Sequence, residues 1–230
     1  HKDDKIDVGD LDEILEIDPI AQTATAEAGI TFQKLVSVTL QYGLVPAIVP
    51  ELSPITVGGA VTGCSLESMS FRYGGFHDTC LRYEVLGSDG ATLVCTPENE
   101  NRFLFQMMHG SFGTLGILTS VTMKLVPAKR YVHMTYEKYS TLAEYKDAIW
   151  RHYRDGDVDY MDGIIHASNE WVLSLGRFAS EAPYTNRYDW TKVYYQSTKK
   201  RREDYIETPQ YLFRYDRGVT NVHPKSAVGR

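Results

Sequence analysis

Alternating small and polar residues begin the first segment whose structure the pattern predicts. Residues 21–30 read AQTATAEAGI, and such alternation is typical of a strand with one buried face. The next segment, 31–43, spaces its apolar residues three and four apart, with Thr31 at its start and Gly43 at its end. Threonine is a favoured N-cap and glycine a favoured C-terminal residue. The pattern therefore predicts a strand followed by a helix.

A hairpin is predicted farther along the sequence. Two runs of β-branched and aromatic residues, within LRYEVLGSDGATLVCTP, flank the dipeptide Asp89-Gly90, which is a strong turn signal. The next residues predict a helix with Thr96 as N-cap and Pro97 in its first turn. A glycine loop at 109–117 then leads into a strand that Pro127 ends.

A second unit is predicted after Pro127. The segment RYVHMTYEKY is strand-like, and Thr141 with Glu144 forms the capping-box pattern at the start of a helix. Residues 160–182 read as two strands joined by ASNE. This order of elements predicts an α+β fold rather than a regular doubly wound sheet, with domains at 1–127 and 128–230.

Composition excludes several classes of protein. The 230 residues are 43% hydrophobic and 23% charged, with a net charge of −6, which argues against a nucleic-acid partner. We find no apolar run of about 18 residues, the minimum for a membrane-spanning helix. The cysteines Cys64, Cys80 and Cys95 lack the C-x-x-C spacing of zinc sites, so we expect no metal and reduced thiols.

Glycines are concentrated between residues 50 and 75, which read PELSPITVGGAVTGCSLESMSFRYGG. Each glycine costs about 0.5–1 kcal/mol of backbone entropy relative to alanine, so a sharp turn or a close approach to the backbone must require them. No lysine follows Gly63, which excludes a Walker A loop, and GGAVTG lacks the spacing of a Rossmann fingerprint.

Two interpretations of this stretch remain open. In the first, it is a nest that turns the N–H groups of Val57, Gly58 and Gly59 towards a pyrophosphate. Hydroxyl groups would add to such a nest, from Thr56, Thr62 and Ser65. In the second, it is a tight loop packed against the sheet.

Several ordered motifs carry a resemblance to a known family. They include ITVGGAVTG, FRYGG, the later SDG and CTPEN, GTLGI and PAKRYV. The sequence resembles the FAD-binding domain of flavoproteins of the vanillyl-alcohol oxidase type, and within them the Δ24-sterol reductases. The likeness covers most of the 230 residues and is densest from 49 to 133.

The resemblance implies an FAD site made of two segments. The first is the loop 56–68 with the Tyr73-Gly74 pair that follows it, and the second is the GTLGI segment. The implied cofactor-binding residues are Thr56, Val57, Gly58, Gly59, Thr62, Gly63, Cys64, Ser65, Glu67, Ser68, Tyr73, Gly74, Gly116 and Ile117. We expect Cys64 to be a small buried residue rather than a redox thiol.

The resemblance also implies a domain plan. Residues 1–127 correspond to the second lobe of an FAD-binding domain of the PCMH type, and the first lobe, which supplies further pyrophosphate contacts in that family, lies before the start of this sequence. Residues 128–230 correspond to part of an α+β substrate domain. An intracellular protein is implied, and association with the endoplasmic reticulum membrane is suggested by the likeness alone.

Three functions are compatible with the sequence. By resemblance, the first is an FAD-dependent oxidoreductase that passes hydride from NAD(P)H through the flavin to a carbon–carbon double bond in the side chain of a sterol. The second is an FAD-linked oxidase or dehydrogenase of an alcohol or hydroxy acid. The third is a flavin-free protein without catalytic activity.

Residue patterns do not identify a catalytic group. His77 and His109 lie beside the glycine segments, and a hydrogen-bonded structural role is the expected one. Arg214 and Arg217 are candidates to hold substrate or coenzyme. We expect the tyrosines between 184 and 215 to pack with their hydroxyl groups at the surface.

Overall fold

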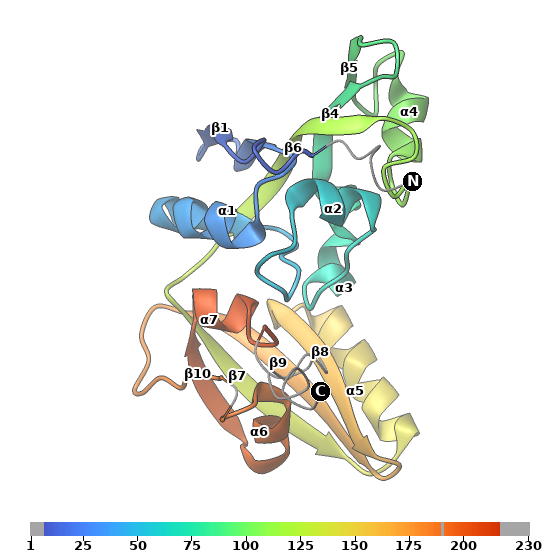
Figure 1. Ribbon diagram of the computed structural model, residues 1–230. Coiled ribbons are helices and arrows are strands. Elements are labelled where there is room, and N and C mark those ends of the chain that lie inside the picture. The colour runs from blue at the N-terminus through green and yellow to red at the C-terminus, as the bar shows by residue number, and fades with distance from the viewer. Residues whose placement is uncertain (1–6, 190, 217–230) are drawn as a thin grey trace, which may run out of the picture. The chain divides into compact units, whose positions relative to one another are not determined.

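Antiparallel strands form the framework of both halves of the protein. The structure, a computed structural model, describes residues 7–189 and 191–216. The protein divides into two units, residues 1–127 and 128–230, and each is described by itself (Figure 1).

The sheet of the first unit has its longest strand near the middle. This strand, β6, pairs on one side with β2 and on the other with β4, and β1 and β5 complete the order β1-β2-β6-β4-β5, while β3 pairs with part of β6. The strand bounds are β1 Ile14–Asp18, β2 Thr23–Glu27, β3 Leu44–Pro46, β4 Cys80–Leu86, β5 Thr92–Cys95 and β6 Ile117–Pro127.

Register separates a polar and an apolar face of this sheet. Ala26 lies opposite Val121, and both are fully buried. The next pair, Thr25 and Thr122, points to the other face, where the two hydroxyl oxygens are 2.9 Å apart. Because side chains alternate along a strand, small residues at every second position of β2 leave room for a helix close to the backbone.

The first predicted strand, helix and hairpin are confirmed. Helix α1, Phe32–Thr39, is capped by the Thr31 hydroxyl, which accepts from the Lys34 N–H at 3.3 Å. A 3₁₀ turn, η1 Leu40–Tyr42, extends it to Gly43, whose φ of 69° suits glycine. Strands β4 and β5 pair around the Asp89-Gly90 turn.

The predicted start of the next helix is wrong. Helix α4 spans Arg102–Met107 rather than beginning at Pro97. The Thr96 hydroxyl accepts from the N–H groups of Glu98 and Asn99, and the Asn99 side chain donates to the Val94 carbonyl at 2.8 Å. These side-chain bonds close a local turn that competes with helix formation.

The glycine-rich stretch forms a helix rather than a loop. Helix α2, Val57–Thr62, packs against β2 and β6, and two shorter helices follow it, α3 Ser70–Tyr73 and η2 Phe76–Thr79. A Cβ on Gly58 would lie 3.0 Å from both the Cβ and the carbonyl oxygen of Ala28. The missing side chain at Gly58 therefore lets α2 begin directly against the end of β2.

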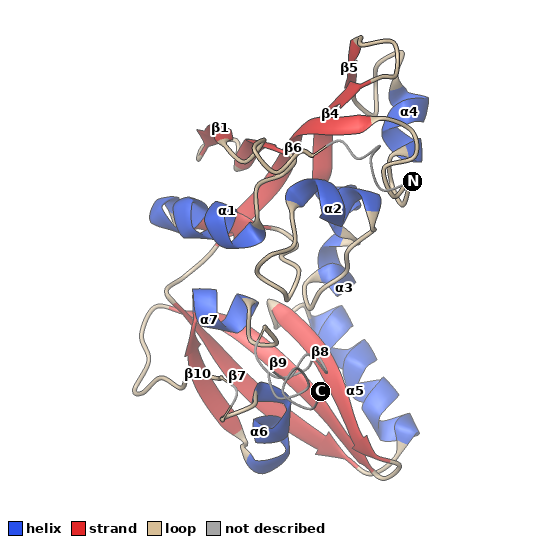
Figure 2. Cartoon of the chain, viewed as in Figure 1, coloured by secondary structure: helices blue, strands red, loops and turns tan. Residues whose placement is uncertain are grey.

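The second unit is a four-stranded antiparallel sheet with helices on both faces. Its strand order is β10-β7-β9-β8. On β7 the Tyr136 ring contacts Tyr194 of α6, whereas its neighbour Glu137 contacts His152 of α5. Since adjacent residues of a strand point to opposite faces, α5 and α6 cover opposite faces (Figure 2). The bounds are β7 Tyr131–Tyr139, α5 Leu142–Asp155, β8 Tyr160–Ala167, β9 Glu170–Ala179, α6 Tyr194–Lys200, β10 Glu203–Glu207 and α7 Thr208–Leu212.

These two units have a mixed α+β architecture built on antiparallel sheets, as the element order predicted. The strands on either side of ASNE and the helix after Thr141 are confirmed as well. Within the described part of the protein, no helix has both the length and the apolar character that crossing a bilayer requires.

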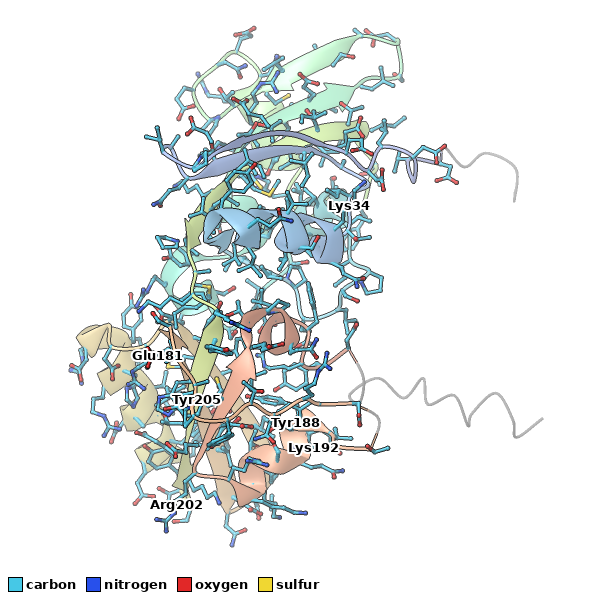
Figure 3. All side chains as sticks on the ribbon, turned by 90° about the vertical axis from the view of Figure 1, so that its left-hand side faces the viewer. Lys34, Glu181, Tyr188, Lys192, Arg202 and Tyr205 are labelled. Carbon is cyan, nitrogen blue, oxygen red and sulfur yellow. The ribbon has the colours of Figure 1, made fainter. Side chains whose placement is uncertain are left out.

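Expectations about the tyrosines and arginines of this unit need correction. Tyr194 and Tyr211 are fully buried, and Tyr188 donates its hydroxyl to the buried Asp204 (Figure 3). Arg214 is buried and forms an ion pair with Asp162, so it is committed to the core of this unit. Arg217 lies outside the described residues.

Replacing Gly58 by alanine tests the contact between α2 and β2. The added Cβ meets Ala28 at 3.0 Å, and overpacking of this kind costs about 1–3 kcal/mol of the free energy of unfolding. Urea unfolding measures the loss, and Ala28→Gly in the same molecule should reduce it.

Gly59→Ala is the matched control. Its Cβ would meet only the Thr56 hydroxyl, at 3.1 Å, which a small rotation relieves. Equal losses for the two variants would contradict the assigned role of Gly58.

Candidate functional site

The first N–H groups of α2 donate hydrogen bonds to other groups of the protein. Val57 donates to the Ile30 carbonyl at 2.9 Å and Gly58 to the Ala28 carbonyl at 2.7 Å. The Gly59 N–H donates to the Thr56 hydroxyl at 3.2 Å, which caps the helix. The nest interpretation, which required these three groups to be free, is therefore wrong. The segment packs against the sheet, as the alternative expected, but as a helix rather than a tight loop.

The two central glycines of α2 differ in their surroundings. Gly58 is half-buried and faces Ala28, whereas Gly59 is exposed. Near Gly59 only the Thr56 hydroxyl lies within 4 Å of where a Cβ would be. Of the pair, Gly59 is the one that offers open backbone surface to a ligand.

A tight turn ends α2. Ser65 donates its N–H to the Ala60 carbonyl at 3.0 Å, and Cys64 adopts a φ of 53°, a left-handed conformation that is uncommon for residues other than glycine. The Cys64 thiol is free and half-buried, so it is more accessible than the buried residue we expected. The Thr62 hydroxyl donates to the Gly58 carbonyl at 3.0 Å.

This turn meets the second glycine segment of the protein. Gly110 donates its N–H to the Val61 carbonyl at 3.4 Å, and Phe112 donates to the Thr62 carbonyl at 3.2 Å. A Cβ on Gly110 would be 3.4 Å from the Cys64 Sγ. We call residues 61–65 and 109–112 together the loop junction.

An exposed aromatic ring marks the loop junction. The Phe112 side chain is 81% exposed, on a residue whose φ is 50°. The Ser111 hydroxyl beside it is buried and has no hydrogen-bond partner within the described structure. Sequence reasoning missed both residues, although an aromatic residue between Gly110 and Gly113 in the HGSFG segment was the available signal.

His109 of the loop junction lies next to a second histidine, His77. The rings of His77 and His109 have centroids 4.9 Å apart, and the Tyr83 hydroxyl lies 3.1 Å from His109 Nε2. Burial, followed by the neighbouring His77, lowers the pKa of His109. His77 Nδ1 is buried and lacks a hydrogen-bond partner among the described residues.

The glycines that follow Tyr73 are explained by the packing of neighbouring side chains. Gly74 has a φ of 77°, and a Cβ there would lie 2.4 Å from an Asp78 carboxylate oxygen. The same carboxylate accepts the Gly75 N–H at 2.7 Å, and a Cβ on Gly75 would meet the His77 ring at 2.4 Å. These two glycines therefore allow the backbone to fold tightly over Asp78 and His77.

The remaining predicted residues occupy two other places. Gly116 packs against β4, since a Cβ there would be 2.7 Å from a Val85 methyl group, and Ile117 begins β6 opposite Leu86. The Glu67 N–H donates to the Ser70 hydroxyl at 2.9 Å, and Ser68 is buried. The structure thus places Gly116 and Ile117 at the start of β6 rather than in the loop junction.

A backbone connection links the start of β6 to the start of α2. Ala28 accepts the Gly58 N–H and donates its own N–H to the Thr119 carbonyl at 2.9 Å. The segments that contain Ile117 and Gly58 are therefore both hydrogen-bonded to Ala28. Contact of the predicted residues with FAD remains a prediction.

Comparison with known proteins gives this geometry a context. Residues 5–96 match the family model described as an FAD binding domain. A Delta(24)-sterol reductase homolog of Caenorhabditis elegans is 30% identical over 94% of this chain, and the Delta(24)-sterol reductase of Homo sapiens is 28% identical over 95%. L-gulonolactone oxidase of Mus musculus is 24% identical over 80%.

The 230 residues span less than half the length of these relatives, with shares of 45%, 44% and 41%. The matched FAD binding domain includes α2 and the turn at Cys64, and it ends before the loop of residues 109–112. Residues 5–96 thus match an FAD binding domain, and the protein is similar to Delta(24)-sterol reductases over most of its own length.

Proposed function

We propose that this protein acts in an FAD-dependent reductase that passes hydride from NAD(P)H through the flavin to a carbon–carbon double bond in the side chain of a sterol. The observation that carries this proposal is the similarity to Delta(24)-sterol reductases over more than nine-tenths of the sequence. In this assignment residues 1–127 bind the cofactor, and residues 128–230 contribute to the substrate pocket.

Features of the first unit fit a flavin nucleotide. Gly59 offers exposed backbone, and Phe112 and Leu66, 81% and 68% exposed, offer apolar surface near the Cys64 turn. The buried Ser111 hydroxyl and His77 Nδ1 supply hydrogen-bonding atoms that no protein group uses in the described structure. When bound, FAD supplies the two-electron chemistry.

In this proposal the protein holds the cofactor and sets the protonation states of the side chains near it. We assign Gly59, the turn at Cys64 and the loop at Gly110 to cofactor contact, and we assign Gly58 and Gly74 to packing. Burial raises the pKa of the Tyr83 hydroxyl far above its ordinary value, so this hydroxyl stays protonated. We assign it as the donor to His109 Nε2, 3.1 Å away. The proton of neutral His109 is then on Nδ1.

A second candidate function is an FAD-linked oxidase or dehydrogenase of an alcohol or hydroxy acid. The similarity to L-gulonolactone oxidase favours it. That similarity is lower, 24% against 30%, and covers less of the sequence, 80% against 94%, so we rank this function second.

Gly59→Val tests the cofactor site. The added side chain occupies open surface beside the Thr56 cap, so we expect at least a tenfold loss of FAD affinity while the midpoint of unfolding changes little. Flavin absorbance after reconstitution and gel filtration measures retention, with Gln106→Val on exposed α4 as the control.

Stoichiometric flavin in Gly59→Val would remove Gly59 from the cofactor site. An unmodified protein that stays colourless after reconstitution with FAD would instead favour the non-catalytic alternative.

Anaerobic reduction separates the two enzyme functions. For the reductase we expect NADPH to bleach the flavin band of the reconstituted protein, and an alcohol or hydroxy acid to leave it unchanged. Stopped-flow absorbance follows both reactions. Bleaching by the alcohol alone would transfer the assignment to the oxidase or dehydrogenase.

Tyr83→Phe tests the protonation state of His109. In our assignment the hydroxyl donates to the neutral imidazole and stabilises it, so its removal should raise the pKa of His109. An NMR titration of the imidazole carbon-bound protons measures this shift, with Tyr42→Phe on exposed η1 as the control.

Protonation of His109 makes the stability of the folded protein depend on pH. The pKa of His109 is lower in the folded than in the unfolded state, so the stabilisation from its neutral form is present above about 6.5. This stabilisation is lost as pH falls through the pKa of His109 in the folded state. Tyr83→Phe should narrow the range of pH between the folded-state and unfolded-state pKa values. An unchanged His109 titration in this variant would contradict the hydrogen-bond assignment.

A further inference from the structure

Left-handed backbone is concentrated at the loop junction. Among the described residues other than glycine, those with a positive φ are Gln22, Cys64 and Phe112. Gln22 belongs to the turn between β1 and β2, whereas Cys64 and Phe112 both lie in the loop junction. This conformation costs free energy for most residues other than glycine. The loop junction therefore contains two strained residues.

Cys64 occupies a position that glycine usually takes. Its N–H donates to the Val61 carbonyl at 3.3 Å, and the next N–H, of Ser65, donates to the Ala60 carbonyl at 3.0 Å. These two bonds at the end of α2 form the Schellman motif, in which the left-handed residue is most often glycine. The position of Cys64 thus explains its φ but not its residue type.

Phe112 occupies a second position of this kind. The Thr114 N–H closes a turn by donating to the Ser111 carbonyl at 3.1 Å, and the central residues of that turn, Phe112 and Gly113, have φ values of 50° and 75°. Turns with positive φ at both central residues are dominated by glycine, asparagine and aspartate. A phenylalanine at the first of them is therefore costly.

The protein gains little from this phenylalanine. Phe112 is 81% exposed, so its ring contributes little to the packing of the described residues. Its backbone is nevertheless fixed, because its N–H donates to the Thr62 carbonyl at 3.2 Å. Strained residues of this kind are concentrated at sites that bind ligands. The turn therefore holds an aromatic ring in solvent, at a defined place beside the end of α2.

The surroundings of the ring fit a nucleotide. Gly59, three residues before Thr62 on α2, exposes its backbone, and Leu66, just after the Cys64 turn, is 68% exposed. An aromatic side chain stacks on any planar heteroaromatic ring, and its replacement by alanine lowers the affinity for a stacked base by about 5- to 150-fold. FAD contains two such rings, adenine and isoalloxazine.

We propose that the Phe112 ring stacks on a planar heteroaromatic ring of the bound flavin nucleotide, and that the left-handed turn serves to hold it there. The inference rests on the proposed FAD site, and it adds to that site the residue that recognises an aromatic ring. The strain is retained because a residue without a ring would form the turn more easily but would bind the cofactor less tightly.

Replacing Phe112 by alanine in the full-length protein tests the stacking contact. We expect the dissociation constant for FAD, measured by titration of flavin fluorescence, to rise at least tenfold. Phe112→Tyr keeps the ring and should stay within about twofold of the unmodified protein. The matched control is Phe103→Ala, which removes another exposed ring, 72% exposed on α4, and should leave the FAD affinity unchanged.

Phe112→Asn separates ligand binding from stability. Asparagine tolerates a positive φ, so the urea midpoint of the FAD-free protein should stay the same or rise, while the FAD affinity falls at least tenfold. A residue that served only to stabilise the loop would lower the urea midpoint as well.

Titrations with ADP and with FMN identify the stacked ring, since ADP contains the adenine and FMN the isoalloxazine. Calorimetry measures both affinities. Phe112→Ala should weaken the binding of one of these two nucleotides and leave the other unchanged.

Four outcomes would overturn the inference. An unchanged FAD affinity in Phe112→Ala would remove the stacking contact and leave the proposed cofactor site intact, whereas absence of FAD binding by the unmodified protein would overturn both. Equal losses for Phe112→Ala and Phe103→Ala would show a general effect of lost apolar surface. A lower urea midpoint in Phe112→Asn would assign the ring to packing within the protein.

Discussion

The backbone contact between Gly58 and Ala28 is the constraint on which the first unit depends. The Gly58 N–H donates to the Ala28 carbonyl at 2.7 Å, and Ala28 in turn donates to Thr119 of β6. A helix can start this close to a strand only where neither residue has a large side chain. The contact fixes the origin of α2, and therefore where its last turn and Cys64 meet the loop at Gly110.

The glycines of this unit look alike in the sequence but serve different purposes. Gly58 makes room for Ala28, Gly74 and Gly75 make room for the side chains of Asp78 and His77, and Gly116 makes room for Val85. Gly59 alone among these five faces solvent. The family resemblance implies a cofactor near these segments, and the structure shows that their glycines differ in how much backbone they expose.

In the second unit, local sequence does not determine which side of α5 is buried. The capping residue Thr141 at the start of α5 follows from local sequence and was predicted. Which side of the helix is buried does not follow, because Tyr145, Trp150 and Tyr153 are all candidates for a core. The structure buries Ala148 and His152, and Glu137 and Asp157 contact His152 from outside the helix.

Local sequence predicted the first strand, the Asp89-Gly90 hairpin, the helices capped by Thr31 and Thr141 and the strands joined by ASNE, because turn geometry and helix caps depend on residues a few positions apart. It failed at α4, where Asn99 and Thr96 close a competing turn, and at α2 it left open whether the N–H groups are free. The tertiary structure alone decided that those N–H groups meet Ile30 and Ala28, and that Tyr83, 26 residues before His109, holds its imidazole. The physical reason is that a hydrogen-bond partner, and the neighbour that fills the space beside a glycine, can come from any part of the sequence that folding brings near.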